Sequence, residues 1–292
     1  MKRKLVKQGT ATMMISLPSK WIKENKLEKG SEVDLTEQGH ELVISSDNIS
    51  SEKNNASIDI SSLSPLVNRI IISYYVKGID ELEIKFSKRE EVKDFANRII
   101  HELIGFEIIK QTQNSLIIKD ITGLEKQDVD SLIRRTFSIV SSMFEELVQA
   151  IEKKQDFEPV IELDFNVNKF VHFCLRVLNK KGYKDNKILP VSEIVSSLEE
   201  LGDNLKKIAK NLDGKEKINS EQLKTVKEIH KSFILFEKLF FEFSKEDIVI
   251  FAKRYESIKK EIKNKNNTDF QLYDLNEILI KMNNPLMTIS FN

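Results

Sequence analysis

Apolar residues recur at every third or fourth position through almost all of the chain after Gly123, which is typical of helices that bury one face. The breaks in this pattern fall at Glu158-Pro159, Gly182, Pro190, Gly214, Ser244 and residues 264–267. We therefore expect six helices, over about 125–153, 158–182, 190–212, 219–243, 246–265 and 270–290. Long helices joined by short turns predict a helical bundle over 123–292, arranged as two three-helix halves.

The chain before residue 125 is expected to form shorter elements, because it contains six of the nine glycines. Within residues 61–122, helices are expected over 63–77 and 89–104, and strands over 81–86, 106–111 and 115–121. This order, αβαββ, predicts a small α/β module. The chain as a whole is expected to be an α+β protein.

Residues 1–46 predict a small domain of two hairpins and a helix. Strands over 3–8 and 11–17 surround Gly9-Thr10, a helix follows Pro18 and ends at Gly30, and a second hairpin turns at Gln38-Gly39. A domain this small is near the lower limit for a core of its own, so we expect two copies to pair. The polar stretch over 47–60 is expected to be a linker.

Charge is unevenly distributed, although the chain has 46 basic and 46 acidic residues. Residues 1–30 hold eight basic and two acidic residues, a net charge of +6, whereas residues 31–60 hold one basic and seven acidic residues, a net charge of −6. The first segment is therefore expected to face a polyanion. The alternative is that its lysines only keep a β-strand soluble.

Composition also narrows the class of protein. The sequence has no apolar run near the roughly 18 residues that span a bilayer, and its start has no long apolar segment of a signal peptide. A single cysteine, Cys174, excludes an intrachain disulfide and a CxxC zinc site. We therefore expect a cytoplasmic protein that is not embedded in a membrane.

The sequence contains few features that indicate an enzyme. The common phosphate-loop, dinucleotide, zinc-protease and nucleophile-elbow motifs are missing, and the four histidines are scattered over elements of different type. No catalytic residues are predicted.

The first 46 residues contain a recognisable order of motifs. Ser16-Leu17-Pro18-Ser19-Lys20-Trp21 is followed by a short helix and then by Leu27-Glu28-Lys29-Gly30-Ser31-Glu32-Val33. This order resembles the SpoVT/AbrB-type swapped-hairpin domain. The resemblance implies a homodimer with interleaved hairpins that binds double-stranded DNA, and it nominates Arg3, Lys4, Lys7 and Lys20 as DNA-binding residues.

Two carboxylates on the third bundle helix form a second motif. Glu199 and Asp203 are four residues apart and so lie on one face of that helix. Such a pair suits a metal ion if another helix supplies further ligands. The alternative is that Asp203 forms ordinary surface ion pairs with Lys206 or Lys207.

Glu199-Glu200-Leu201-Gly202-Asp203, with Ile208-Ala209 after it, resembles the PhoU family of phosphate-uptake regulators, and residues 132–151 and 165–178 resemble the two preceding helices of that fold. With the SpoVT/AbrB-like head before it, this order resembles an archaeal-type architecture. It implies a DNA-binding regulator of phosphate uptake or phosphate-responsive transcription, and a divalent or ferric metal ion held by Glu199, Asp203 and Asp164.

This sequence departs from the PhoU pattern at two ligand positions. Asn168 and Ile280 stand where the family has aspartates, and Pro285 interrupts the Ile-Ala-Glu stretch of that family. At most one of the two metal clusters of the family could therefore be present. His172 could complete that cluster, but a histidine between Val171 and Phe173 more often packs partly buried.

Two further roles are compatible with the sequence. The chain could be a helical adaptor that restrains a phosphate transporter or its signalling partner, with the head serving only to dimerise. It could also be a metal-storage or metal-sensing bundle. Cys174 and the phenylalanines between Phe233 and Phe243 are expected to be helix-packing residues.

Overall fold

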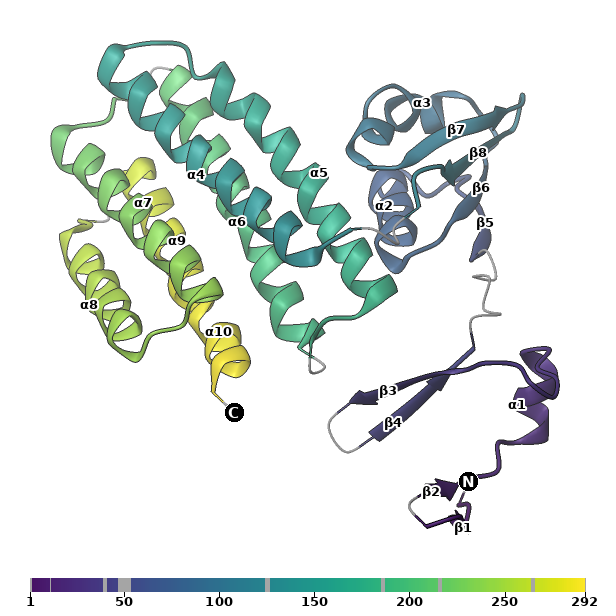
Figure 1. The fold of residues 1–292 in the computed structure, drawn as a ribbon. Helices are drawn as coiled ribbons and strands as arrows, with labels where there is room; N and C mark the ends of the chain where they lie inside the picture. The colour runs from purple at the N-terminus through teal and green to yellow at the C-terminus, as the bar shows by residue number, and fades with distance from the viewer. Residues whose placement is uncertain are drawn as a thin grey trace. The chain divides into compact units, whose positions relative to one another are not determined.

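The computed structural model describes residues 2–10, 12–38, 41–46, 54–123, 127–184, 187–214, 217–263 and 266–291. The chain divides into two compact units, residues 1–54 and 55–292 (Figure 1). The fold is α+β, as the sequence predicts: the strands that the structure describes all precede residue 121, and long helices follow.

The first unit contains two separate antiparallel hairpins and one short helix. Its elements are β1 (Val6–Gln8), β2 (Thr12–Met14), α1 (Ser19–Glu24), β3 (Asp34–Gln38) and β4 (Glu41–Ser45). β1 pairs with β2 and β3 with β4, and the predicted turn residue Gly39 lies outside the described residues. The hairpin-helix-hairpin order agrees with the prediction, although β1 and β2 are shorter than expected.

Helix α1 ends earlier than Gly30, the end that the sequence suggests. Lys26 adopts the left-handed conformation with φ 52°, and the Leu27 N–H donates to the Ile22 carbonyl at 3.0 Å. The Lys26 N–H donates to the Lys23 carbonyl at 3.2 Å, which completes a Schellman motif. The helix therefore stops one turn before the glycine.

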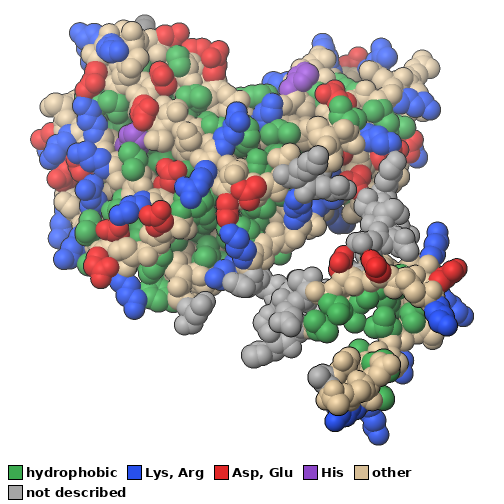
Figure 2. Space-filling view, viewed as in Figure 1, with side chains coloured by type: hydrophobic (Ala, Val, Ile, Leu, Met, Phe, Trp, Pro, Cys, Tyr) green, Lys and Arg blue, Asp and Glu red, His purple; other side chains and the backbone are tan. Residues whose placement is uncertain are grey.

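The first unit has almost no buried interior. Ser46 is its one buried residue among those whose exposure the structure describes. Large apolar side chains are instead open to solvent, as the green atoms of this unit in Figure 2 show. The exposed ones are Leu5, Val6, Met13, Met14, Ile15, Leu35 and Leu42.

The second unit begins with a four-stranded sheet in the order β5-β6-β8-β7. Its strands are β5 (Asn55–Asp59), β6 (Glu81–Lys85), β7 (Phe106–Gln111) and β8 (Ser115–Asp120). β5 runs parallel to β6, and the other pairs are antiparallel. Alternate side chains of β6 and β8 are buried on one face of the sheet, namely Leu82, Ile84, Leu116 and Ile118.

The linker prediction for residues 47–60 is wrong at residues 55–59, which form β5, while residues 47–53 lie outside the described residues. β5 is an edge strand in which exposed and half-buried side chains alternate. Only Ala56 and Ile58 pack against the core, so the sequence of this strand is mostly polar and resembles a linker. The predicted αβαββ module is therefore βαβαββ.

Three short helical elements complete the module: α2 (Val67–Lys77), α3 (Glu90–Asn97) and the 3-10 helix η1 (Ile99–Glu102). The predicted helix over 89–104 is thus two elements, which meet at Arg98. α2 packs against α3, and η1 packs against the bundle helix α5 (Glu158–Lys181). The module and the bundle therefore belong to one compact unit.

The bundle helices described by the structure are α4 (Val129–Lys153), α5, α6 (Ile188–Asp213), α7 (Ser220–Phe241), α8 (Lys245–Glu261), α9 (Asn267–Lys281) and α10 (Asn283–Ser290). α4, α5 and α6 pack against one another, as do α7, α8 and α9. The two groups meet where α6 contacts α9 and α10 and where α4 contacts α7.

The last helix predicted from the sequence is in fact two, α9 and α10, with Met282 between them. Pro285 is the third residue of α10. Backbone N–H groups in the first turn of a helix have no partner within that helix, so the N–H that proline lacks is not needed at this position. Pro285 therefore does not interrupt a helix here. It lies in the first turn of a new one.

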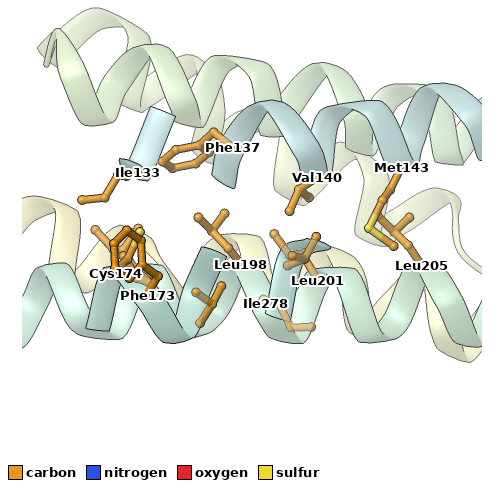
Figure 3. Packing of buried hydrophobic residues seen from close by; sticks show 14 of the residues in the cluster. Ile133, Phe137, Val140, Met143, Phe173, Cys174, Leu198, Leu201, Leu205 and Ile278 are labelled. Carbon is orange, nitrogen blue, oxygen red and sulfur yellow. The ribbon is translucent and has the colours of Figure 1, made fainter. Parts of the chain in front are cut away.

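The bundle core forms where α4 faces α6 (Figure 3). Phe137, Val140 and Met143 of α4 are fully buried, and so are Leu198 and Leu201 of α6. The apolar stripe along α6, from Val191 to Leu212, is also buried. No helix in the described part of the chain combines the length and apolar composition that crossing a bilayer requires.

Candidate functional site

The predicted DNA-binding residues are spread over three segments of the first unit. Arg3 and Lys4 precede β1, Lys7 lies within it, and Lys20 lies in the first turn of α1. All four side chains are exposed. Lys20 lies 3.8 Å from Glu24, but its side chain is 87% exposed, so this ion pair is weak and leaves the lysine accessible.

The predicted metal ligands do come together in the second unit, at the contact between α5 and α6. Asp164 of α5 and Asp203 of α6 both accept hydrogen bonds from the Lys206 ammonium, each at 2.6 Å. Glu199 lies one turn before Asp203. Glu102 of η1 is near enough to raise the pKa of Glu199, and Asp164 is near enough to raise the pKa of Glu102. We call these four acidic residues and Lys206 the carboxylate cluster.

Burial and mutual repulsion dominate the electrostatics of this cluster. Burial, followed by the nearby carboxylates Asp203, Asp164 and Glu102, raises the pKa of Glu199 to about 7. Burial likewise raises the pKa of Glu102, although Arg98 lies 3.7 Å away. The pKa of Asp164 is also raised by burial, against the opposing effect of Lys206.

Three polar atoms along one side of α5 are buried without a hydrogen-bond partner: Oδ1 of Asp164, Oδ1 of Asn168 and Nδ1 of His172. The residues follow one another at four-residue intervals, so they line one face of the helix. His172 is only 9% exposed, and burial lowers its pKa to about 4. His172 is thus a buried neutral side chain, as expected for a packed histidine.

The residues present do not fit a metal ion. The Lys206 ammonium lies between the two aspartates that would be ligands, and Asn168 offers a neutral amide. Across the residues described by the structure, no group of three or more His, Cys, Asp or Glu side chains is arranged to hold a metal. The ion pair between Asp203 and Lys206, which the sequence offered as the alternative to a metal, is present.

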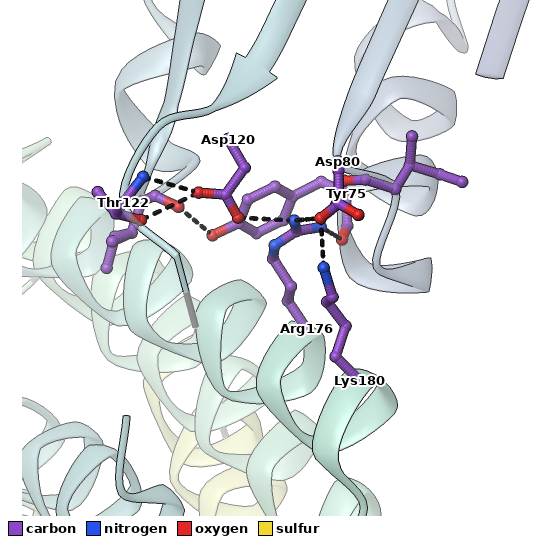
Figure 4. Close-up of polar contacts among 8 residues, drawn as sticks. Tyr75, Asp80, Asp120, Thr122, Arg176 and Lys180 are labelled. Atoms are coloured by element: carbon purple, nitrogen blue, oxygen red, sulfur yellow. Dashed lines mark hydrogen bonds and ion pairs between the residues drawn. The ribbon is translucent and has the colours of Figure 1, made fainter. Parts of the chain in front are cut away.

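A second polar site joins the α/β module to the bundle through Arg176 of α5 (Figure 4). Arg176 is fully buried. Its Nη1 donates to the backbone carbonyls of Tyr75 at 2.7 Å and Ile79 at 2.8 Å, and its Nη2 donates to Asp120 Oδ2 at 2.9 Å. The guanidinium carbon also lies 4.8 Å from the ring centres of both Tyr75 and Phe106.

The acidic partners of Arg176 are held by further contacts. Asp120 accepts two hydrogen bonds from Thr122, from its N–H and its hydroxyl, each at 3.0 Å. Burial opposes ionisation of Asp120, but the hydrogen bonds from Arg176 and Thr122 keep its pKa below the ordinary value. Asp80 lies 3.4 Å from Nη2 of Arg176 and also pairs with Lys180. We call this set of contacts the Arg176 latch.

The latch is not among the sites predicted from the sequence, although the sequence does contain a signal for it. Arg176 interrupts the run Phe173–Leu178, in which all the remaining side chains except Leu175 are buried. A charged residue within a buried helical stripe needs a partner. Those partners lie between 56 and 101 residues away in the chain, too far for local pattern to identify them.

Two further expectations are confirmed. Cys174 is fully buried, and burial raises the pKa of its thiol to about 12. Phe233 and Phe236 are also fully buried and pack against Phe137 of α4, with ring centres 5.6 and 6.3 Å away. These residues belong to the core.

Comparison of the chain with protein-family models, with curated proteins and with solved structures gave no match. A functional proposal must therefore rest on the chain's own residues and on the motifs within its sequence.

Proposed function

We propose that the chain is a homodimeric DNA-binding regulator of phosphate uptake or of phosphate-responsive transcription. The observation that carries this proposal is the exposure of apolar and basic side chains in the first unit. Seven large apolar side chains are exposed among its described residues, and Arg3, Lys4, Lys7 and Lys20 are accessible at its surface.

A second copy of the same unit is the partner that the apolar side chains favour. Leu35 and Leu42 lie on paired strands, 60% and 56% exposed, and a hairpin alone is marginally stable in water. Pairing of two copies would bury these side chains and supply the missing core. It would also double the number of cations on one surface.

The cations give the proposed dimer its affinity for DNA. Lysine and arginine side chains that neutralise phosphates release counterions, and each neutralised phosphate adds about −0.9 to the slope of log affinity against log salt. A two-fold dimer favours a pseudo-symmetric operator. The link to phosphate comes from the resemblance of the bundle sequence to PhoU.

The test is binding of the purified chain to duplex DNA from its own promoter region, titrated with salt. We expect sequence-preferring binding that weakens steeply with salt and is lost in Lys4→Glu plus Lys7→Glu. Lys207→Glu plus Lys217→Glu is the matched control, because it makes the same change of charge at exposed positions of the second unit. Binding no stronger than to random DNA would contradict the proposal.

A groove between α8 and α10 favours a second function, that of a helical adaptor. Its lining includes the apolar Ile248, Val249, Ala252 and Met287 together with two lysines and a glutamate. A helix of a phosphate transporter or its signalling partner would place apolar side chains there. For an adaptor, the promoter titration should show only salt-sensitive binding that is equal for every DNA sequence.

A further inference from the structure

Helices α5 and α6 approach each other closely beside the carboxylate cluster. A Cβ atom added to Gly202 would lie 3.3 Å from Cγ1 of Val167, so only glycine allows this distance without rearrangement. The close approach brings Asp164 of one helix within reach of Lys206 on the other. The short helix η1 packs against α5, and its last residue, Glu102, lies near this contact between α5 and α6.

The cluster contains more negative than positive charge. Four carboxylates are near one another, and the nearby cations are Lys206, Arg98 at 3.7 Å from Glu102, and Lys210, which acts on Asp164 at longer range. Lys206 makes the closest contacts, with two bonds of 2.6 Å, a length typical of charge-assisted hydrogen bonds. The Asp164 side chain is only 8% exposed, so loss of that cation would leave a poorly hydrated carboxylate.

We propose that the Lys206 ammonium is the resident cation of the carboxylate cluster and takes the position that a metal ion would otherwise occupy. The cluster is then complete as the chain folds, and it needs no metal.

Asn168 fits this assignment. It follows Asp164 by one helical turn, and its Oδ1 is buried without a partner. An aspartate at this position would add a further negative charge to a cluster in which carboxylates already outnumber cations. A neutral amide avoids that additional repulsion.

Among the described residues no three carboxylates are arranged around the Lys206 position, but Asp164 and Asp203 both reach it, so removing Lys206 should let a metal ion bind between them. Wild-type protein should show the same melting temperature in EDTA and in Mn²⁺, and paramagnetic resonance of free Mn²⁺ should show no stoichiometric binding. Lys206→Ala should melt at a lower temperature in EDTA, bind one Mn²⁺ per chain at least about tenfold more tightly than wild type, and recover stability when Mn²⁺ is added.

Lys207→Ala is the matched control, since it removes an exposed lysine from the next position of the same helix and should behave as wild type. Adding Asp164→Asn to Lys206→Ala removes the uncompensated carboxylate. The double variant should be more stable than Lys206→Ala in EDTA, and it should lose the gained Mn²⁺ affinity.

Two results overturn the proposal. The first is stoichiometric Mn²⁺ binding by wild type that Asp203→Asn abolishes, and the second is a Lys206→Ala protein with no gain in Mn²⁺ affinity, whatever its stability. If Lys206→Ala does not fold, the double variant decides. Its folding supports the assignment of Lys206, and its failure to fold overturns it.

Discussion

Arg176 shows how a charged side chain is paired inside this protein. Desolvating a guanidinium costs several kcal/mol, on the order of the whole stability of a small domain. Two backbone carbonyls, two aspartates and two aromatic rings offset that cost here. The balance depends on all partners being present at once.

Replacing this arginine by methionine should therefore be severe. Arg176→Met leaves Asp120 buried without its cation, and we expect a loss of about 3–5 kcal/mol in the free energy of unfolding measured in urea. Adding Asp120→Asn should recover part of that loss. Arg69→Met, at an exposed arginine of α2, is the control and should change stability by less than about 0.5 kcal/mol. Equal losses in both variants would argue against the latch.

His172 should make the fold sensitive to acid. Its pKa is about 4 in the folded chain against 6.5 normally, so the unfolded state binds the proton first as the pH falls. The contribution of neutral His172 to the free energy of unfolding is then fully present above pH 6.5. It declines between pH 6.5 and 4, by at most about 3 kcal/mol. In His172→Gln the unfolding free energy should fall less over this window.

His101→Gln is the control for this pH profile, because His101 is exposed. Its profile should follow that of wild type. If His172→Gln also follows wild type between pH 6.5 and 4, then His172 accepts a proton in the folded chain as readily as in the unfolded one.

Among the secondary-structure elements, the long helices are the ones that the sequence predicts best. Each carries an apolar stripe over several turns, so one broken position does not hide the period. β5 was missed because five residues with two half-buried apolar side chains resemble a polar linker. The division at Met282 was missed because apolar residues continue across it.

The candidate sites follow the same logic. Local spacing placed Glu199 and Asp203 on one face, and the structure brings Asp164 to them. Local spacing could not decide which cation they meet, because Lys206 reaches a helix that begins 48 residues earlier in the chain. The partners of Arg176 are more distant still. Pairings between remote segments are set by tertiary packing.

The contact between α5 and α6 gives a prediction for a whole element. Gly202→Val would force its side chain against Val167, and we expect a loss of about 1–3 kcal/mol in the free energy of unfolding. Glu200→Val places the same side chain at an exposed position of α6 and should cost far less. Similar losses in both variants would show that a poor fit to the helix, not the approach of α5, is responsible.

At the scale of the molecule, the two units differ in how their stability arises. The second unit buries a continuous apolar core, whereas the first leaves its apolar side chains open. If the first unit pairs with its copy, its stability depends on protein concentration, whereas that of the second does not.

Charged side chains in the exposed apolar surface of the β3–β4 hairpin should therefore separate the proposed dimer. We expect wild type to sediment as a dimer and Leu35→Lys plus Leu42→Lys to sediment as a monomer, because four lysines per dimer would enter the new core. Leu189→Lys plus Ile250→Lys is the control, since both residues are exposed in the second unit. A double-lysine variant that remains a dimer would place the interface elsewhere.

The Arg176 latch also limits how a gene for such a chain can be rearranged. A recombination event that exchanged residues 55–123 alone would supply a new module while leaving an arginine inside the apolar face of α5. An exchange of the bundle alone would orphan Asp120 and the carbonyls of Tyr75 and Ile79. The module and the helices that follow it are therefore expected to be inherited together, and a breakpoint on the N-terminal side of β5 leaves the latch intact.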